Sequence, residues 1–156
     1  MKQIIQFSDI VLTGLIAGII FGIWIGYNPR DLSAATYVEQ QQNAIHALNV
    51  LMPILGLISI LLTVVYAVMC KREKSKRNLL FIATILLIVS GLITRFGNQS
   101  INAIVITWNL ETIPDTWTAL RDKWWSFHIM RTLSTMIAFA LIVWATINNK
   151  DASTTA

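Results

Sequence analysis

The sequence predicts an all-α membrane protein, a four-helix transmembrane bundle in a single domain over residues 1–156. Hydrophobic residues make up 55% of the chain and charged residues only 13%, with a mean hydropathy of +0.62. A soluble domain carries about 25% charged residues. Four uncharged runs are each about as long as the 17–25 residues that a helix needs to cross a bilayer. We place these spans at about residues 10–27, 47–70, 78–95 and 130–147.

The chain lacks the motifs of several common enzyme classes. None of the four runs alternates polar and apolar residues as a transmembrane strand does. A single cysteine excludes an internal disulfide framework and a multi-cysteine metal cluster. HExxH, Walker-loop and GxSxG motifs are absent from the sequence, so zinc protease, nucleotide-binding and serine-hydrolase functions have no support.

The loop at residues 71–77 predicts the topology, because five of its seven residues are Lys or Arg. Short loops rich in these residues stay in the cytoplasm. Both termini then lie in the cytoplasm, most simply of a bacterial inner membrane, and residues 28–46 and 95–131 lie outside. The charges on the predicted inner side, seven basic and three acidic, carry the whole net charge of +4; they are Lys2, Asp9, Lys71, Arg72, Glu73, Lys74, Lys76, Arg77, Lys150 and Asp151. The basic loop is too short for a nucleic-acid-binding surface.

The first apolar run has an alternative interpretation. It could be a cleaved signal peptide instead of a retained transmembrane helix.

The first two helices carry features that predict their packing. Glycines recur every four residues along the first one, which favours close approach of another helix; they are Gly14, Gly18, Gly22 and Gly26. Asn28-Pro29 should end this helix. The second helix begins before the membrane, with Glu39, Gln42/Asn43 and His46 on one face. Pro53 should kink it, and neighbouring helices must cover the carbonyl that Pro53 leaves free.

The third and fourth helices are predicted to extend beyond the membrane on the non-cytoplasmic side. Arg95, Asn98, Asn102 and Asn109 share one face if the third helix continues to about residue 109. Thr112-Ile113-Pro114-Asp115 has the composition of a helix start. From there a helix reaching residue 147 would be roughly 50 Å long, against about 30 Å for the bilayer core.

Polar residues of three predicted helices meet at the outer end of the bundle. Ionisable groups near the apolar layer usually face the bundle interior and mark functional sites. The residues are His46, Arg95, Asn98, Asn102, Arg121, His128 and Arg131, accompanied by Trp117, Trp124 and Trp125. The alternative is that the arginines snorkel at the interface and the tryptophans form an aromatic belt.

These side chains offer a limited chemistry. Histidine can act as a base, asparagine and arginine can hold an oxyanion, and tryptophan can stack on a flat apolar substrate. We expect no metal and no cofactor. Haem b held by His46 and His128 as axial ligands is the alternative.

Short motifs carry a family resemblance over about residues 10–147. Asn98-x-x-Ile101-Asn102 precedes Trp117-x3-Arg121-x2-Trp124-x3-His128-x2-Arg131, and a glycine-rich helix ending near Asn28-Pro29 comes first. This arrangement resembles the anthrone oxygenase-like (DUF1772) family of small four-helix membrane proteins. The resemblance implies that the chain is related to oxygenases that turn an anthrone into an anthraquinone without metal or flavin. The positions that match the motif are Asn98, Asn102, Arg121, Trp124, His128 and Arg131.

The resulting functional hypothesis is a cofactor-independent oxidoreductase acting on a flat phenolic or enolisable apolar substrate at an outward-facing pocket. The predicted catalytic residues are His128, Arg121, Asn102, Asn98 and Arg131. The predicted substrate-binding residues are His46, Trp124, Trp125, Trp117 and Arg95. A haem-binding cytochrome and a non-enzymatic binding or assembly protein are the alternatives. The expected partners are the lipid bilayer and a small aromatic substrate, not nucleic acid, and self-association into a homo-oligomer stays open.

Overall fold

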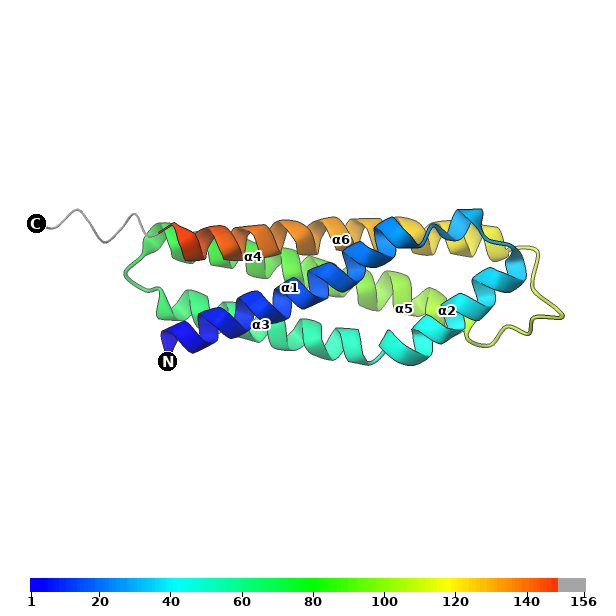
Figure 1. Cartoon of the computed structure of the whole chain (residues 1–156), viewed down its shortest axis with the longest axis horizontal. Coiled ribbons are helices and arrows are strands. Elements are labelled where there is room, and N and C mark those ends of the chain that lie inside the picture. The colour runs from blue at the N-terminus through cyan, green and yellow to red at the C-terminus, as the bar shows by residue number, and fades with distance from the viewer. Residues whose placement is uncertain (149–156) are drawn as a thin grey trace, which may run out of the picture.

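A computed structural model describes residues 1–148, and within them the chain is all helical (Figure 1). Four helical stretches are long and apolar enough to cross a membrane. The elements are α1 (Lys2–Gly26), the 3₁₀ turn η1 (Pro29–Asp31), α2 (Ala34–Leu48), α3 (Leu51–Met69), α4 (Lys74–Leu92), the π-helical turn η2 (Ile93–Asn98), α5 (Gln99–Val105) and α6 (Trp117–Ile147). The predicted four-helix bundle is confirmed.

Small residues let the bundle pack tightly. The central contacts join α4 to α6 and α3, and α1 to α3 and α6. Ala67, Ala83, Ala138 and Ala145 are all buried in the core between these helices, where a small side chain permits close helix approach. Large apolar side chains face outward along every long helix, for example Leu15, Leu57, Ile85 and Ile137. A bundle with this apolar exterior is an integral membrane protein.

The two ends of the bundle differ in chemistry (Figure 1). One end, which we call the basic end, holds Lys2 and the turn between α3 and α4. There Glu73 pairs with Lys2 of α1 and with Lys76 of α4. The opposite end, which we call the site end, holds α2, α5 and the connections at residues 27–33 and 106–116. The C-terminal charges assigned to the inner side, Lys150 and Asp151, lie outside the described residues.

The third helix continues past Gly97, as predicted, but it ends at Val105 and not at residue 109. The π-helical turn η2 joins α4 to α5, so the helical stretch covers Lys74–Val105. A π turn inserts one extra residue and commonly marks a functional site. Asn109 lies beyond the helix, where its Oδ1 accepts a hydrogen bond from the Glu111 amide.

The predicted start of the fourth helix at Thr112 is wrong. α6 begins at Trp117, after turns in which the Thr112 amide donates to the Asn109 carbonyl and the Trp117 amide to the Pro114 carbonyl. The helix-start signals of this segment therefore stabilise turns. With 31 residues, α6 is still about 46 Å long, longer than a bilayer core.

The second helix is broken before Pro53, where the sequence predicted a kink. α2 ends at Leu48 and α3 begins at Leu51, which puts Pro53 in the first turn of α3. The Asn49 carbonyl, four residues before the proline, accepts a hydrogen bond of 2.8 Å from Gln99 Nε2 of α5. A neighbouring helix thus covers the freed carbonyl.

The glycine face of α1 is met by a partner only near its start. A Cβ atom added to Gly14 would lie 3.1 Å from the Phe139 ring of α6. At Gly18, Gly22 and Gly26 it would meet nothing within 4 Å among the described residues. The expected packing along the whole face is therefore wrong for these three positions within the monomer. α1 still belongs to the bundle, with Ile16, Ala17 and Ile20 buried.

Candidate functional site

A cavity of about 170 Å³ lies at the site end, bordered by residues of α1, α2, α3, η2, α5 and α6. Most of its wall surface is apolar. The polar and aromatic residues that line it are Tyr27, Gln40, Gln41, Asn49, Thr94, Asn98, Gln99, Asn102, Trp124 and Arg131. We call it cavity 1. An apolar pocket with a few convergent polar groups is the usual form of a small-molecule site.

Asn102 is the centre of an amide network on this wall. Its Oδ1 accepts from the Trp124 indole Nε1 at 2.9 Å and from Gln41 Nε2 at 3.1 Å, while its Nδ2 donates to Asn49 Oδ1 at 2.9 Å. The indole N–H can only donate, which fixes the orientation of the Asn102 amide. Gln41 must therefore turn its Nε2 toward Asn102.

This orientation leaves amide oxygens free at the cavity. Gln41 Oε1 has no hydrogen-bond partner among the described residues. Asn98 is fixed in the same way, because its Nδ2 donates to the Trp124 carbonyl, an acceptor only, at 3.0 Å. Its Oδ1 is likewise without a partner within residues 1–148, as is the Tyr27 hydroxyl. Three cavity-lining groups thus await a ligand or water.

His128 holds Arg131 in place. His128 is fully buried, and its Nε2 lies 3.0 Å from the Ile20 carbonyl oxygen. Because that oxygen can only accept, Nε2 carries the proton and Nδ1 presents a lone pair. Arg131 donates to this Nδ1 from Nη2 at 2.9 Å and from Nε at 3.3 Å. Both ring nitrogens of His128 are therefore engaged.

Arg131 is a cation without an acidic partner anywhere in the described part of the chain. Besides His128, its guanidinium approaches Thr94 Oγ1 at 3.5 Å. It lines cavity 1 and also a second cavity of about 230 Å³, called cavity 2, between α1, α3, α4 and α6. An unpaired guanidinium at the junction of two apolar cavities favours an anionic ligand.

Aromatic rings enclose His128 from one side. Trp124 and Trp125 both lie nearly parallel to its imidazole, with ring centroids 5.1 and 5.4 Å away. Trp124 also lines cavity 1, whereas Trp125 does not. Trp125 is thus placed to support His128.

The structure brings only part of the predicted site to the cavities. Asn98, Asn102, Trp124 and Arg131 line cavity 1. Arg95 is exposed but borders cavity 2. His46 is exposed on α2 and lines neither cavity.

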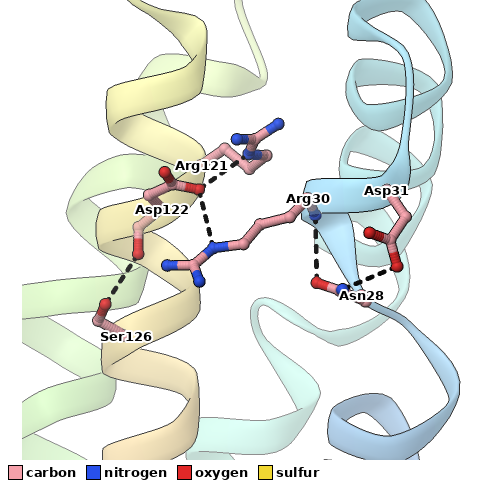
Figure 2. Close-up of polar contacts among 6 residues, drawn as sticks. All are labelled: Asn28, Arg30, Asp31, Arg121, Asp122 and Ser126. Atoms are coloured by element: carbon pink, nitrogen blue, oxygen red, sulfur yellow. Dashed lines mark hydrogen bonds and ion pairs between the residues drawn. The ribbon is translucent and has the colours of Figure 1, made fainter.

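Arg121 and Trp117 lie at the tip of α6, away from both linings. Arg121 stacks over the Trp117 ring at 4.8 Å and donates to Asp122 at 3.0 Å. Figure 2 shows Asp122 also accepting from Arg30 of the loop after α1, at 3.3 Å. This cluster ties the loop to α6 and is a structural contact rather than part of the cavity.

Sequence reasoning missed Tyr27, Gln41, Asn49 and Gln99. For Gln41 a signal existed, since Tyr37, Gln41 and Ile45 are spaced by four residues and all are buried on one face of α2. A single glutamine in an otherwise apolar stripe marks a polar interior contact. Burial raises the pKa of the Tyr37 hydroxyl far above its ordinary value, so this side chain stays neutral. Its ring packs against Trp117 in a tilted arrangement, with the centroids 5.8 Å apart.

The two histidines do not fit a haem site with axial ligands from both. Iron ligation by His128 would break its hydrogen bond to Ile20 or to Arg131. His46 is exposed on α2 and lines neither cavity, whereas His128 is buried. The described residues also contain no group of three His, Cys, Asp or Glu that could hold a metal ion.

A family model described as anthrone oxygenase matches residues 42–141. The chain belongs to the anthrone oxygenase family. The matched segment contains the wall of cavity 1 from Ala44 to Arg131, including Asn98, Asn102 and Trp124, and also the buried His128. It leaves out α1 and three further residues that line the cavity, Tyr27, Gln40 and Gln41. No curated protein and no solved structure matched the chain.

Proposed function

We propose that this anthrone oxygenase family member is a cofactor-independent oxidoreductase that oxidises a flat phenolic or enolisable molecule in cavity 1. We further propose that it resides in a bacterial inner membrane with the site end outward. The basic loop at residues 71–77 supports this orientation, because such loops remain in the cytoplasm.

The observation that carries the proposal is the unpaired guanidinium of Arg131 at an apolar cavity. A positive charge attracts an enolate or phenolate oxygen much more strongly in a low-dielectric wall than the same two charges attract each other in water. The substrate then ionises more readily on binding. The polar function of the substrate is expected to lie against Arg131 and its flat ring against Trp124.

The free groups of the cavity define the rest of the ligand. Gln41 Oε1 and Asn98 Oδ1 are acceptors, so they favour hydroxyl groups on the substrate. The Tyr27 hydroxyl can donate to a carbonyl or accept from a hydroxyl. A hydroxylated aromatic ketone satisfies all of these groups, whereas a plain hydrocarbon satisfies none.

His128 is proposed to act through its bond to Arg131. When the guanidinium turns toward the substrate oxygen, Nδ1 of His128 is released and can take the substrate proton. Loss of this proton from a CH₂ group leaves a carbanion, which forms a C–O bond by giving its electrons to dioxygen. His128 returns the proton to the peroxide anion, and the resulting hydroperoxide loses water to form a carbonyl group. One CH₂ group and one dioxygen thus yield one ketone and one water.

The test is oxygen consumption by the purified protein in lipid nanodiscs, supplied with an anthrone. Arg131→Gln should lower kcat/KM by about 10²-fold or more, as loss of an oxyanion contact does. The control Arg72→Gln changes an exposed arginine at the basic end and should keep wild-type turnover. Equal turnover by Arg131→Gln and the wild type, or no oxygen consumption by any of them, contradicts the proposal.

A further inference from the structure

A second polar cluster lies between α1 and α3, next to cavity 2. Asp9 and Thr13 of α1 face Ser59 and Thr63 of α3, and all four side chains are fully buried. A carboxyl group in the interior of a membrane-spanning helix is costly and usually functional. The sequence had placed Asp9 among the charges on the cytoplasmic side, so this cluster was not expected.

One arrangement of the hydrogen bonds around Thr63 places a proton on Asp9. Thr63 Oγ1 lies 2.9 Å from the Ser59 carbonyl oxygen and 2.8 Å from Asp9 Oδ1. A hydroxyl has one proton, and the carbonyl can only accept. If Thr63 donates to the carbonyl, the contact with Asp9 requires a proton on Oδ1 of the carboxyl group. Asp9 Oδ2 has no partner within residues 1–148, which suits a neutral acid better than a carboxylate.

Within residues 1–148, Asp9 forms no ion pair with a cation. α1 packs against α3 and α6, and α3 has no charged residue. Lys2 of α1 is paired with Glu73 at the basic end. The remaining titratable groups on or next to these helices are Tyr27, directly after α1, and Tyr66 of α3, which contacts Thr146. On the site half of α6 they are Arg121, Asp122, Lys123, His128 and Arg131.

A chain of hydroxyl groups links Asp9 to cavity 2. Thr13 Oγ1 lies 3.3 Å from Asp9 Oδ1 and 2.6 Å from Ser59 Oγ. Ser59 and Arg131 both line cavity 2. At about 230 Å³ the cavity has room for several waters, since each occupies roughly 30 Å³ in the liquid.

We propose that Asp9 is a proton-binding site within the membrane-spanning bundle, which exchanges its proton with cavity 2 through Thr13 and Ser59. On release, the Asp9 hydroxyl turns from Thr63 to Thr13, its O–H bond breaks and the proton passes to Thr13 Oγ1. Thr13 gives its own proton to Ser59 Oγ, and Ser59 gives its own to water in cavity 2. The carboxylate then accepts from Thr13 and Thr63, and uptake reverses these steps.

The test is infrared spectroscopy of the full-length protein in liposomes near neutral pH, without substrate. The wild type should show the C=O stretching band of a protonated carboxylic acid, which shifts in D₂O. Asp9→Asn should lose this band. The matched control Asp31→Asn changes an exposed carboxylate bonded to Asn28 and should keep it.

Ser59→Ala tests the path with Asp9 intact. This variant should keep the band, but the band should shift more slowly after transfer to D₂O because the link to cavity 2 is missing. A wild type without an Asp9-dependent band overturns the proposal. So does exchange in Ser59→Ala that is as fast as in the wild type, or a band that disappears on addition of Na⁺ at constant pH, which would indicate a cation site instead.

Discussion

At the scale of single residues, donor-only and acceptor-only partners determine the site. The Trp124 indole and the Trp124 carbonyl fix the amides of Asn102 and Asn98, and the Ile20 carbonyl fixes the tautomer of His128. The residue types and the helical spacing of Asn98, Asn102, Trp124 and Arg131 could be read from the sequence. The free oxygens of Gln41 and Asn98 could not, because they depend on which atom each amide turns to its neighbour.

Gly97 tests the packing at the π-helical turn. A Cβ atom at this position would lie 2.7 Å from Phe127 Cγ, so Gly97→Ala forces one helix to shift. We expect the free energy of unfolding to fall by about 1–3 kcal/mol, as for other overpacked sites. Unfolding by denaturant in mild detergent measures the change.

The control for this variant is Gly22→Ala, because a Cβ atom at Gly22 meets nothing within 4 Å in the described structure. Its stability should stay at or slightly above that of the wild type, given the better helix propensity of alanine. Equal stability of the two variants would mean that α6 is not packed against Gly97 as described.

At the scale of elements, the sequence predicted the long helices well and their ends poorly. Uncharged runs of bilayer length require a helix, whatever the neighbours do. The start of α6 depends instead on the turns around Asn109 and Pro114 that compete with Thr112 as a cap. The π-helical turn was also beyond prediction, because no residue pattern distinguishes it from the regular helix on either side.

Glu73 gives an element-scale prediction at the turn between α3 and α4. Hydrogen bonds from Lys2 and Lys76 hold the pKa of Glu73 below its ordinary value of 4.5. Its ionised pairing therefore stabilises the fold above that value and is lost as the pH falls through the lower, folded pKa. Wild-type stability should decline over this acidic range.

Glu73→Gln is the variant that isolates this contribution. It should be less stable than the wild type near neutral pH, and the difference should vanish in acid, as measured by thermal unfolding at a series of pH values. A stability difference that does not depend on pH would show that the ion pairs do not matter. Exposed ion pairs are worth little, so the effect should be small.

At the scale of the whole molecule, the two ends of the bundle have separate roles. The basic end joins α1 to α4 through Glu73, and the site end carries the cavities and the amide network. The sequence predicted this division from the basic loop and the polar residues of three helices. It did not predict that a buried acid, Asp9, would lie between the ends, since a lone charge near the start of a span reads as an exposed flanking residue.

Topology follows from this division and can be measured in intact cells. We expect Thr112→Cys, in the turn before α6, to react with a membrane-impermeant maleimide. Ser75→Cys, in the basic loop, should react only after the membrane is opened. Cys70, the native thiol, is buried and should contribute no background. If Ser75→Cys alone is labelled in intact cells, the protein has the opposite orientation to the one proposed.

The central claim is that Arg131 makes cavity 1 a site for an anionic aromatic oxygen. Its most direct test is the absorbance of a coloured hydroxylated anthrone or phenol bound to the protein in nanodiscs, which reports the ionised fraction without turnover. The wild type should shift the bound molecule toward its anion, and Arg131→Gln should bind it mainly in the neutral form. An ionised fraction that is the same in both proteins would contradict the account.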